Sequence, residues 1–240
     1  MQRILLTLFA IVSFQAAVLA QKTIKDENAQ VRDAKNFHGI SVGHAFTVYL
    51  NQANEEAVAV SASEERFRDL ITVEVKNGIL YIGLDKKGWK LNLGNKKLKA
   101  YISFKNIDKL DISGACNAII DGTIKAAGDL DIDLSGASDM KGRVEAKKLT
   151  VDLSGASDMT LSGITTDLRI DASGACKFKG FELATDYCNA RASGASDIRI
   201  TVNKELSVNA SGASDIDYKG TGMIRDVRSS GASKISRVGS

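Results

Sequence analysis

The tripeptide Ser-Gly-Ala occurs seven times at nearly constant intervals, and this repeat constrains the fold more than any other feature of the sequence. The intervals between successive glycines are 22, 19, 19, 20, 18 and 19 residues. Self-similarity at a fixed period near twenty is typical of solenoids, in which each repeat buries its apolar side only by stacking on its neighbours. The seven repeat glycines are Gly114, Gly136, Gly155, Gly174, Gly194, Gly212 and Gly231.

Each repeat alternates apolar and polar residues before its glycine. Around Gly155, the residues Leu149, Val151 and Leu153 are separated by polar residues. Strict alternation predicts a half-buried β-strand, because successive side chains of a strand point to opposite faces. An apolar residue returns four positions after the glycine, as at Met159, and predicts a second strand. One repeat is therefore predicted to form a strand, a bend at Ser-Gly-Ala, a second strand and a return.

Parallel stacking of these repeats satisfies the pattern best. It places equivalent residues of successive repeats side by side and pairs the strand edges with each other. The period is too short for strand–helix–strand units. An antiparallel meander is the alternative, but it would not align identical residues. We therefore predict an all-β, right-handed parallel β-helix (solenoid) with about 19 residues per turn, the hand following from the rule for parallel crossovers.

The Ser-Gly-Ala segment is predicted to be a structural turn. Glycine adopts left-handed backbone conformations without steric cost, so we expect such a backbone at Gly155 and its equivalents. Alanine follows every repeat glycine, and the next position is always serine or cysteine, as at Ser157 and Cys176. Free cysteine behaves as a small apolar residue. This column therefore indicates a packed corner and not a row of catalytic serines.

The first residues predict export. Residues 1–20 have a basic start, a short apolar run and small residues at their end, which together are typical of a signal peptide. We expect an exported protein located in the periplasm, at the cell surface or in the medium. No second apolar stretch is long enough to span a bilayer, so no transmembrane segment is expected after cleavage. The formal net charge of +3 gives no reason to expect a nucleic-acid partner.

The rest of the chain is expected to be one domain, because no proline or linker-like stretch interrupts it. Residues 21–36 are polar and are predicted to be a flexible N-terminus. A single β-helix domain then covers residues 37–240. Its first part, residues 37–104, is strand-like and contains Asn-Gly at positions 77 and 78, a strong hairpin signal. This part is predicted to cap the seven repeats of residues 105–238.

The sequence contains no catalytic or cofactor motif that we recognise. It lacks a G-x-S-x-G nucleophile elbow and a phosphate-binding glycine loop. The only histidines, His38 and His44, match no usual metal-ligand spacing. Three cysteines without a CxxC motif do not indicate a disulfide scaffold. We expect Cys116 and Cys176 to be unpaired and Cys188 to be a buried thiol. The chain is thus predicted to be no enzyme and to need no metal or cofactor.

An acidic column is the candidate ligand face. Three positions before the glycine, the first four repeats carry aspartate, and the later repeats carry Arg191, Asn209 and Arg228. Stacked carboxylates suit calcium or a basic partner, or could act on polysaccharides. A solvated face that opposes aggregation is the other interpretation. The four acids are Asp111, Asp133, Asp152 and Asp171.

Six lysines between positions 86 and 99 form a second charged feature. The simplest interpretation is a solvated loop, and the alternative is a patch for anionic glycans or lipid head groups. The lysines are Lys86, Lys87, Lys90, Lys96, Lys97 and Lys99.

Three motifs resemble a known family. The segment from Phe37 to Leu50 follows F-x-x-I-x-V-x-x-x-F-x-V-x-L, an Asn-Gly pair precedes Leu80, and Leu-Ser-Gly-Ala-Ser-Asp recurs from Leu134 and Leu153. Together they resemble the auto-transporter adhesins with a head GIN domain, an exported domain of unknown function in Gram-negative bacteria. The resemblance spans about residues 37–235. It implies a β-helix similar in shape to pectin lyases, without their catalytic residues, and a role in adhesion.

The leading hypothesis is therefore a non-enzymatic exported β-helix protein, an adhesin or surface binding module for a glycan or protein partner. The alternatives are a polysaccharide-acting enzyme of pectin-lyase-like shape and a cell-envelope scaffold. A groove that gathers acids with an arginine or lysine in fixed geometry would favour the enzyme.

Overall fold

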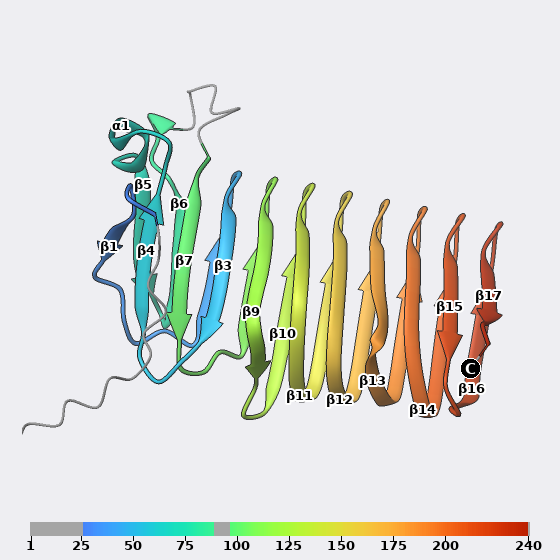
Figure 1. Cartoon of the computed structure of the whole chain (residues 1–240). Helices are drawn as coiled ribbons and strands as arrows, with labels where there is room; N and C mark the ends of the chain where they lie inside the picture. Colours follow the sequence, from blue (N-terminus) through green and yellow to red (C-terminus); the bar gives the residue numbers. More distant parts are fainter. Residues whose placement is uncertain (1–25, 89–96, 240) are drawn as a thin grey trace, which may run out of the picture.

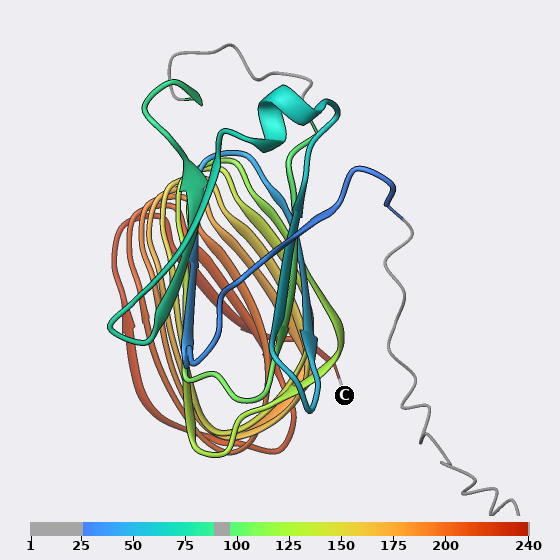
Figure 2. The same cartoon turned by 90° about the vertical axis from the view of Figure 1, so that its left-hand side faces the viewer.

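The computed structural model describes residues 26–88 and 97–239, which are wound into a flattened β-solenoid (Figure 1, Figure 2). All its strands belong to one 17-stranded sheet, and this confirms the predicted all-β solenoid. The predicted signal peptide, residues 1–20, lies outside the described residues. In chain order the elements are β1 (Gln30–Arg32), β2 (Gly39–Val42), β3 (Thr47–Gln52), β4 (Ala57–Ser61), α1 (Glu65–Arg68), β5 (Ile71–Lys76), β6 (Ile79–Leu84), β7 (Lys99–Phe104), β8 (Lys109–Ile112), β9 (Asn117–Lys125), β10 (Asp129–Leu134), β11 (Asp139–Leu153), β12 (Asp158–Ala172), β13 (Lys177–Ala192), β14 (Asp197–Ala210), β15 (Asp215–Lys219), β16 (Met223–Ser229) and β17 (Lys234–Arg237).

Each coil of the repeat region has two arms. We call the arm that leads into a Ser-Gly-Ala corner the incoming arm, and the arm that leaves the corner the outgoing arm. Strands β11 to β14 each begin as an outgoing arm, pass a far bend, and end as the incoming arm of the next coil (Figure 1). Pairing is parallel, with Leu149 opposite Leu168 and Met140 opposite Met159. Equivalent residues of successive repeats therefore stack on each other as predicted.

The core is a layer of apolar side chains between the two arms. Around the corner at Gly155, the incoming arm contributes Leu149, Val151 and Leu153, and the outgoing arm contributes Met159 and Leu161, all of them buried. Burial of these side chains is the main force that holds the arms together. The alternate residues of both arms face solvent and are free to carry function.

At the seven Ser-Gly-Ala corners there is no room for any residue but glycine at the central position. The repeat glycines have φ between +73° and +101°, the left-handed conformation predicted for them. A Cβ atom at Gly155 would lie 2.4 Å from the carbonyl oxygen of Gly136 in the preceding corner. That oxygen accepts a hydrogen bond from the N–H of Ala156 at 2.7 Å. Backbone conformation and close stacking of the corners therefore both exclude a side chain.

From the second repeat onward, the serine or cysteine that follows Gly-Ala closes its own corner. The Ser157 hydroxyl donates to the carbonyl oxygen of Ser154 at 2.9 Å, and the Cys176 thiol donates to that of Ser173 at 3.2 Å. Ser157 and Cys176 are both buried. These residues therefore serve the fold, because they satisfy a turn carbonyl from within.

A further corner of the same kind precedes the seven copies. His44 has φ of +80° and takes the place of a repeat glycine. Its carbonyl oxygen accepts a hydrogen bond from Ala115 at 2.5 Å and would lie 2.3 Å from a Cβ at Gly114. Strands β2 and β3 flank His44 and pair in parallel with β8 and β9. The sequence conceals this corner because its Gly-His-Ala lacks the central glycine of the motif.

The N-terminal strands cap the stack, but not in chain order. Strands β6 and β7 add a parallel layer on β2 and β3, so the strands that come early in the chain lie one layer inside. Antiparallel pairing of β5 with β6 and of β4 with β7 then ends the parallel stack. Asn77 and Gly78, with φ of +51° and +76°, form the predicted hairpin turn between β5 and β6.

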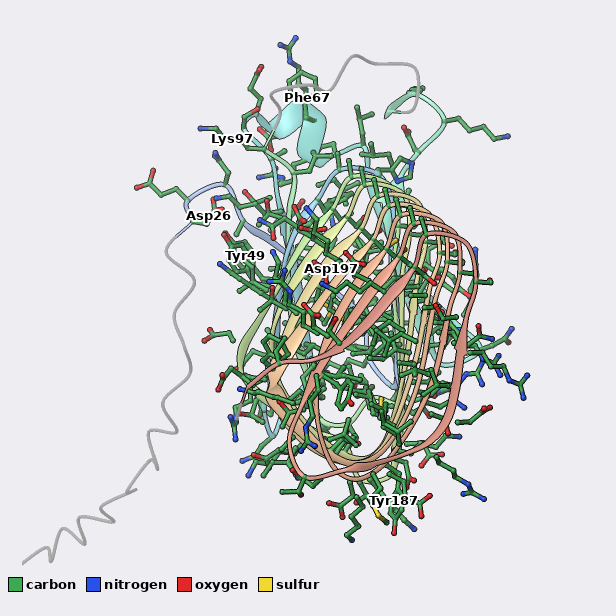
Figure 3. All side chains as sticks on the ribbon, turned by 90° about the vertical axis from the view of Figure 1, so that its right-hand side faces the viewer. Asp26, Tyr49, Phe67, Lys97, Tyr187 and Asp197 are labelled. Carbon is green, nitrogen blue, oxygen red and sulfur yellow. The ribbon has the colours of Figure 1, made fainter. Side chains whose placement is uncertain are left out.

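Residues 26–36 differ from the flexible N-terminus expected from the sequence. Strand β1 pairs antiparallel with β4. Asp26 accepts hydrogen bonds from Lys99 at 2.8 Å, from Tyr101 at 2.7 Å and from Ser61 at 3.1 Å. The polar residues of this segment thus find partners on the cap and are attached to it. Figure 3 shows Asp26 and Tyr49 on the same side of the coil.

Candidate functional site

The described residues form a hollow on the outward face of each kind of arm. The first has a volume of about 410 Å³ and lies on the incoming arms of β10 to β14, just before the corners. We call it the polar hollow. One serine from each of these coils lies beside the charged and amide side chains that line it. Those side chains are Asp133, Asp152, Asp171, Arg191 and Asn209.

Parallel register places the predicted acidic column in one row. Each member pairs directly with the equivalent residue of the next coil, and neighbouring strands are about 4.8 Å apart. Asp111 lies at the N-terminal end of the row, beyond the polar hollow. The row runs through Asp111, Asp133, Asp152, Asp171, Arg191, Asn209 and Arg228.

The first two acids of the row have partners from neighbouring strands. The Ser41 hydroxyl donates to Asp111 at 3.2 Å, and Lys109 Nζ lies 3.8 Å from a carboxylate oxygen of Asp133. Partial burial nevertheless raises the pKa of Asp133. The nearby charges of Asp152, Asp111 and Asp131 act in the same direction, and the combined effect outweighs that of Lys109.

The third and fourth acids differ from each other. Arg169 forms a close ion pair with Asp171, and Arg191 Nε lies 4.0 Å from the same carboxylate. Asp152 forms no ion pair within 4.0 Å in residues 26–88 and 97–239. Partial burial, and then the neighbouring charge of Asp171, raise the pKa of Asp152. Asp152 is therefore the carboxylate most available to an incoming partner.

The polar hollow is suited to hydrogen bonding. Within the described residues, no group of three or more His, Cys, Asp or Glu side chains is arranged to hold a metal ion. The hollow instead offers carboxylates as acceptors, Arg191 and Asn209 as donors, and a row of serine hydroxyls that can do either. A partner rich in hydroxyl or amide groups would match this lining.

The second hollow has a volume of about 540 Å³ and lies on the outgoing arms of β9 and β11 to β14. We call it the basic hollow, because Lys141, Arg143, Lys179 and Arg199 line it together with a single acid, Glu182. Sequence reasoning missed this hollow. A signal was present: Lys141, Lys179 and Arg199 each lie five positions after a repeat glycine, in one outward column.

The lysines of residues 86–99 contribute to neither hollow among the described residues. Lys90 and Lys96, with the rest of residues 89–96, lie outside the described part of the chain. Lys99 lies 2.8 Å from Asp26 and serves to attach the N-terminal segment to the cap.

The cysteines and histidines have structural roles. Cys116, Cys176 and Cys188 are buried free thiols, as predicted. Burial raises the pKa of Cys188 far above its usual value and raises that of Cys116, so both are held in the unreactive thiol form. His38 Nδ1 lies 2.9 Å from Asp108 and links β2 to the coil, while His44 forms the corner described above.

The parallel coil, its glycine corners and its outward rows of polar side chains define a β-solenoid with long exposed faces. The chain belongs to the family described as "Putative auto-transporter adhesin, head GIN domain", whose model matches residues 36–222. The resemblance noted in the sequence is thereby confirmed.

Solved structures share the fold. A putative adhesin from Bacteroides fragilis superposes with a TM-score of 0.81 at 21% identity, covering 88% of this chain and 96% of the other. A putative adhesin from Parabacteroides merdae has a TM-score of 0.71 at 18% identity, with 88% and 95% covered. A putative lipid binding protein from Parabacteroides distasonis has a TM-score of 0.67 at 17% identity, with 89% and 98% covered. No curated protein matches the chain.

In residues 26–88 and 97–239 there is no helix with the length and apolar character needed to cross a membrane.

Proposed function

We propose that this protein is an exported, non-enzymatic binding module that attaches to a surface glycan or protein through the polar hollow. Its family is one of adhesins, and two of the solved structures that share its fold are also described as adhesins. The observation that carries the proposal is the unbroken row of polar side chains across the incoming arms, which forms an open hollow of about 410 Å³.

The backbone holds this row in place before any partner arrives. Each incoming arm is paired on both sides by parallel strands, so the spacing of the side chains is set by the sheet. A surface that is already ordered loses little conformational entropy on binding. A linear glycan that follows the row could donate hydroxyl hydrogens to Asp152 and accept hydrogen bonds from Arg191 and Asn209.

A glycan array probed with the chain from position 21 onward tests this proposal. We expect binding to a restricted set of glycans, and at least a tenfold loss of affinity in Ser173→Trp, because the indole would fill the polar hollow. Thr166→Trp is the matched control, since Thr166 is exposed near the far bend of the same coil and lines neither hollow. Binding that survives Ser173→Trp would place the site elsewhere.

If the chain binds no glycan, the alternative within the proposal is a protein partner. The same pair of variants tests this alternative. Purified envelope proteins and host surface proteins can be cross-linked to the parent chain. Cross-linking that Ser173→Trp abolishes and Thr166→Trp preserves would support a protein partner at the polar hollow.

One observation favours a second function, a polysaccharide-acting enzyme. The polar hollow gathers three carboxylates with Arg191, which is the combination of groups expected for such an enzyme. Against it, the carboxylates project from one face of the sheet, whereas glycoside hydrolysis uses two carboxyl groups that flank the bond. The assay is the appearance of new reducing ends or unsaturated sugars after incubation with each bound polysaccharide. Product formation that Asp152→Asn removes would replace the binding module with an enzyme.

A further inference from the structure

The basic hollow is a trough whose walls are made by extra residues. Strands β11 and β12 pair without interruption from Lys141 to Arg143, and they form its floor. On one side the register with β9 breaks between Lys141 and Arg143, where β9 has extra residues around Gly122. On the other side β13 has extra residues around Phe181 relative to both β12 and β14. Such bulges often mark binding sites, because they redirect side chains from the regular pleat.

The inner surface of the trough is largely apolar. Ile119 and Phe181 are half-buried and face it from opposite walls, and Ile120 and Leu161 lie deeper. Gly142 lies on the floor, and Ile120 occupies the space that its side chain would take, because a Cβ there would lie 2.3 Å from the Cβ of Ile120. The lining therefore offers apolar contact where the polar hollow offers hydrogen-bonding groups.

The rim of the trough is positively charged. Four basic side chains line it against one acid, Glu182. Lys179 forms an ion pair with an aspartate at 3.7 Å, and Arg199 forms one with another aspartate at 3.1 Å. Lys141 has no acidic partner within 4.0 Å in the described part of the chain. Its ammonium group is therefore the cation most available to an anionic ligand.

We propose that the basic hollow binds an anionic amphiphile, an alkyl chain that ends in a carboxylate or phosphate group. The alkyl chain lies between the walls formed by Ile119 and Phe181, and the anionic group pairs with Lys141 at the rim. Burial of the alkyl chain is favourable in proportion to the apolar area removed from water, so the apolar trough supplies affinity and the cation supplies selectivity. An acidic polysaccharide fits less well, because the trough gives its hydroxyls few partners. This site is on the other arm from the polar hollow and is independent of the proposed adhesive function.

Titration with dansyl-undecanoic acid tests the proposal, because the dansyl emission rises when the probe leaves water. We expect saturable binding below the micelle concentration and displacement by laurate and by dodecyl phosphate. Dodecanol has the same chain without the charge and should displace the probe at least tenfold less well. Acetate and inorganic phosphate, which carry the charge without the chain, should not displace it.

Two variants locate the site. Lys141→Glu reverses the charge at the rim and Thr160→Trp fills the floor, and each should weaken probe binding about tenfold or more. Lys147→Glu and Thr166→Trp are the matched controls. They make the same changes at exposed positions of β11 and β12 outside both hollows and should bind like the parent chain. Circular dichroism and the melting temperature should be the same in all four variants.

Several results would overturn the proposal. They are the absence of saturable binding, equal displacement by dodecanol and laurate, and equal loss in variants and controls. Displacement of the probe by polygalacturonate, but not by laurate, would assign the hollow to an acidic polysaccharide instead. Glycan binding through the polar hollow is tested by Ser173→Trp, so failure of either proposal leaves the other intact.

Discussion

The incoming and outgoing arms share one core but present opposite surfaces. Across the incoming arms the register is unbroken from β8 to β14, and the outward side chains form an acidic, hydrogen-bonding row. Across the outgoing arms the register breaks at β9 and at β13, and the outward side chains form a basic trough with an apolar interior.

This difference shows two ways in which a repeat protein makes a binding surface. Exact repetition stacks like residues into rows but leaves the surface nearly flat. Extra residues in single coils break the rows and create depth. Both arms are joined at the corner, where the close stacking of successive backbones allows only one backbone conformation. Extra residues are therefore found in the arms, away from the corner.

The largest expected effect contrasts a corner with a register break. Gly155→Val should lower the free energy of unfolding by more than about 3 kcal/mol, because a Cβ there meets the carbonyl of Gly136 at 2.4 Å and the backbone is left-handed. Gly122→Val, in the bulge of β9, should cost about 1–2 kcal/mol, since φ is +84° but no atom lies within 4 Å. Urea denaturation measures both. Equal costs would mean that close stacking of the corners does not select glycine.

The second effect concerns the pKa of an acid on the outgoing side, which is shifted in the opposite direction from that of Asp152 in the incoming row. Partial burial acts to raise the pKa of Asp26, but hydrogen bonds from Lys99, Tyr101 and Ser61 outweigh it and lower the pKa to about 2. Asp26→Asn should therefore destabilise the protein by about 1–2 kcal/mol at pH 7. This stabilisation is complete above the ordinary value near pH 4 and is lost as the pH falls to about 2.

Thermal melts of the parent chain and Asp26→Asn between pH 2 and pH 7 measure this difference. Asp33→Asn is the control, because Asp33 is exposed and forms no salt bridge within the described residues. A difference in melting temperature that stays constant down to pH 2 would contradict the role of the Asp26 carboxylate.

The third effect concerns the corner that lacks glycine. His44→Gly should raise the free energy of unfolding by about 1 kcal/mol, because His44 holds a φ of +80° that disfavours a side chain. His44→Ala keeps the Cβ and should give no such gain. Differential scanning calorimetry of the two variants separates them. Destabilisation by His44→Gly would show that packing of the imidazole against Gly83 outweighs the backbone cost.

The smallest effect tests the acidic row. Asp152→Asn should stabilise the protein by a few tenths of a kcal/mol at low salt, because it removes a carboxylate whose pKa is raised by burial and by Asp171. The gain should be present at neutral pH and fade as the pH falls through the acidic range, because the parent carboxyl, whose pKa is raised, then becomes protonated and loses its charge. Melting temperatures with and without millimolar calcium provide the measurement. A calcium-dependent rise that Asp152→Asn abolishes would make the row a cation site.

Much of the repeat region could be predicted from the sequence. The position of Leu149 in its apolar column, the left-handed backbone of Gly155 and the pairing of Asp133 with Asp152 all follow from one short pattern. The cap is different. Its hairpin was visible at Asn77, but the placement of β2 and β3 inside β6 and β7 depends on contacts between residues far apart in the chain.

The sequence by itself determined the period, the buried columns, the glycine corners and the acidic row, because in-register stacking turns a local pattern directly into neighbours in space. Only the tertiary structure decided that His44 is a corner, since the stacked backbone and not the residue type imposes its conformation. It also decided the basic hollow. The lysine and arginine column was present in the sequence, but its depth comes from extra residues in β9 and β13 whose bulges become walls only when the coils are stacked.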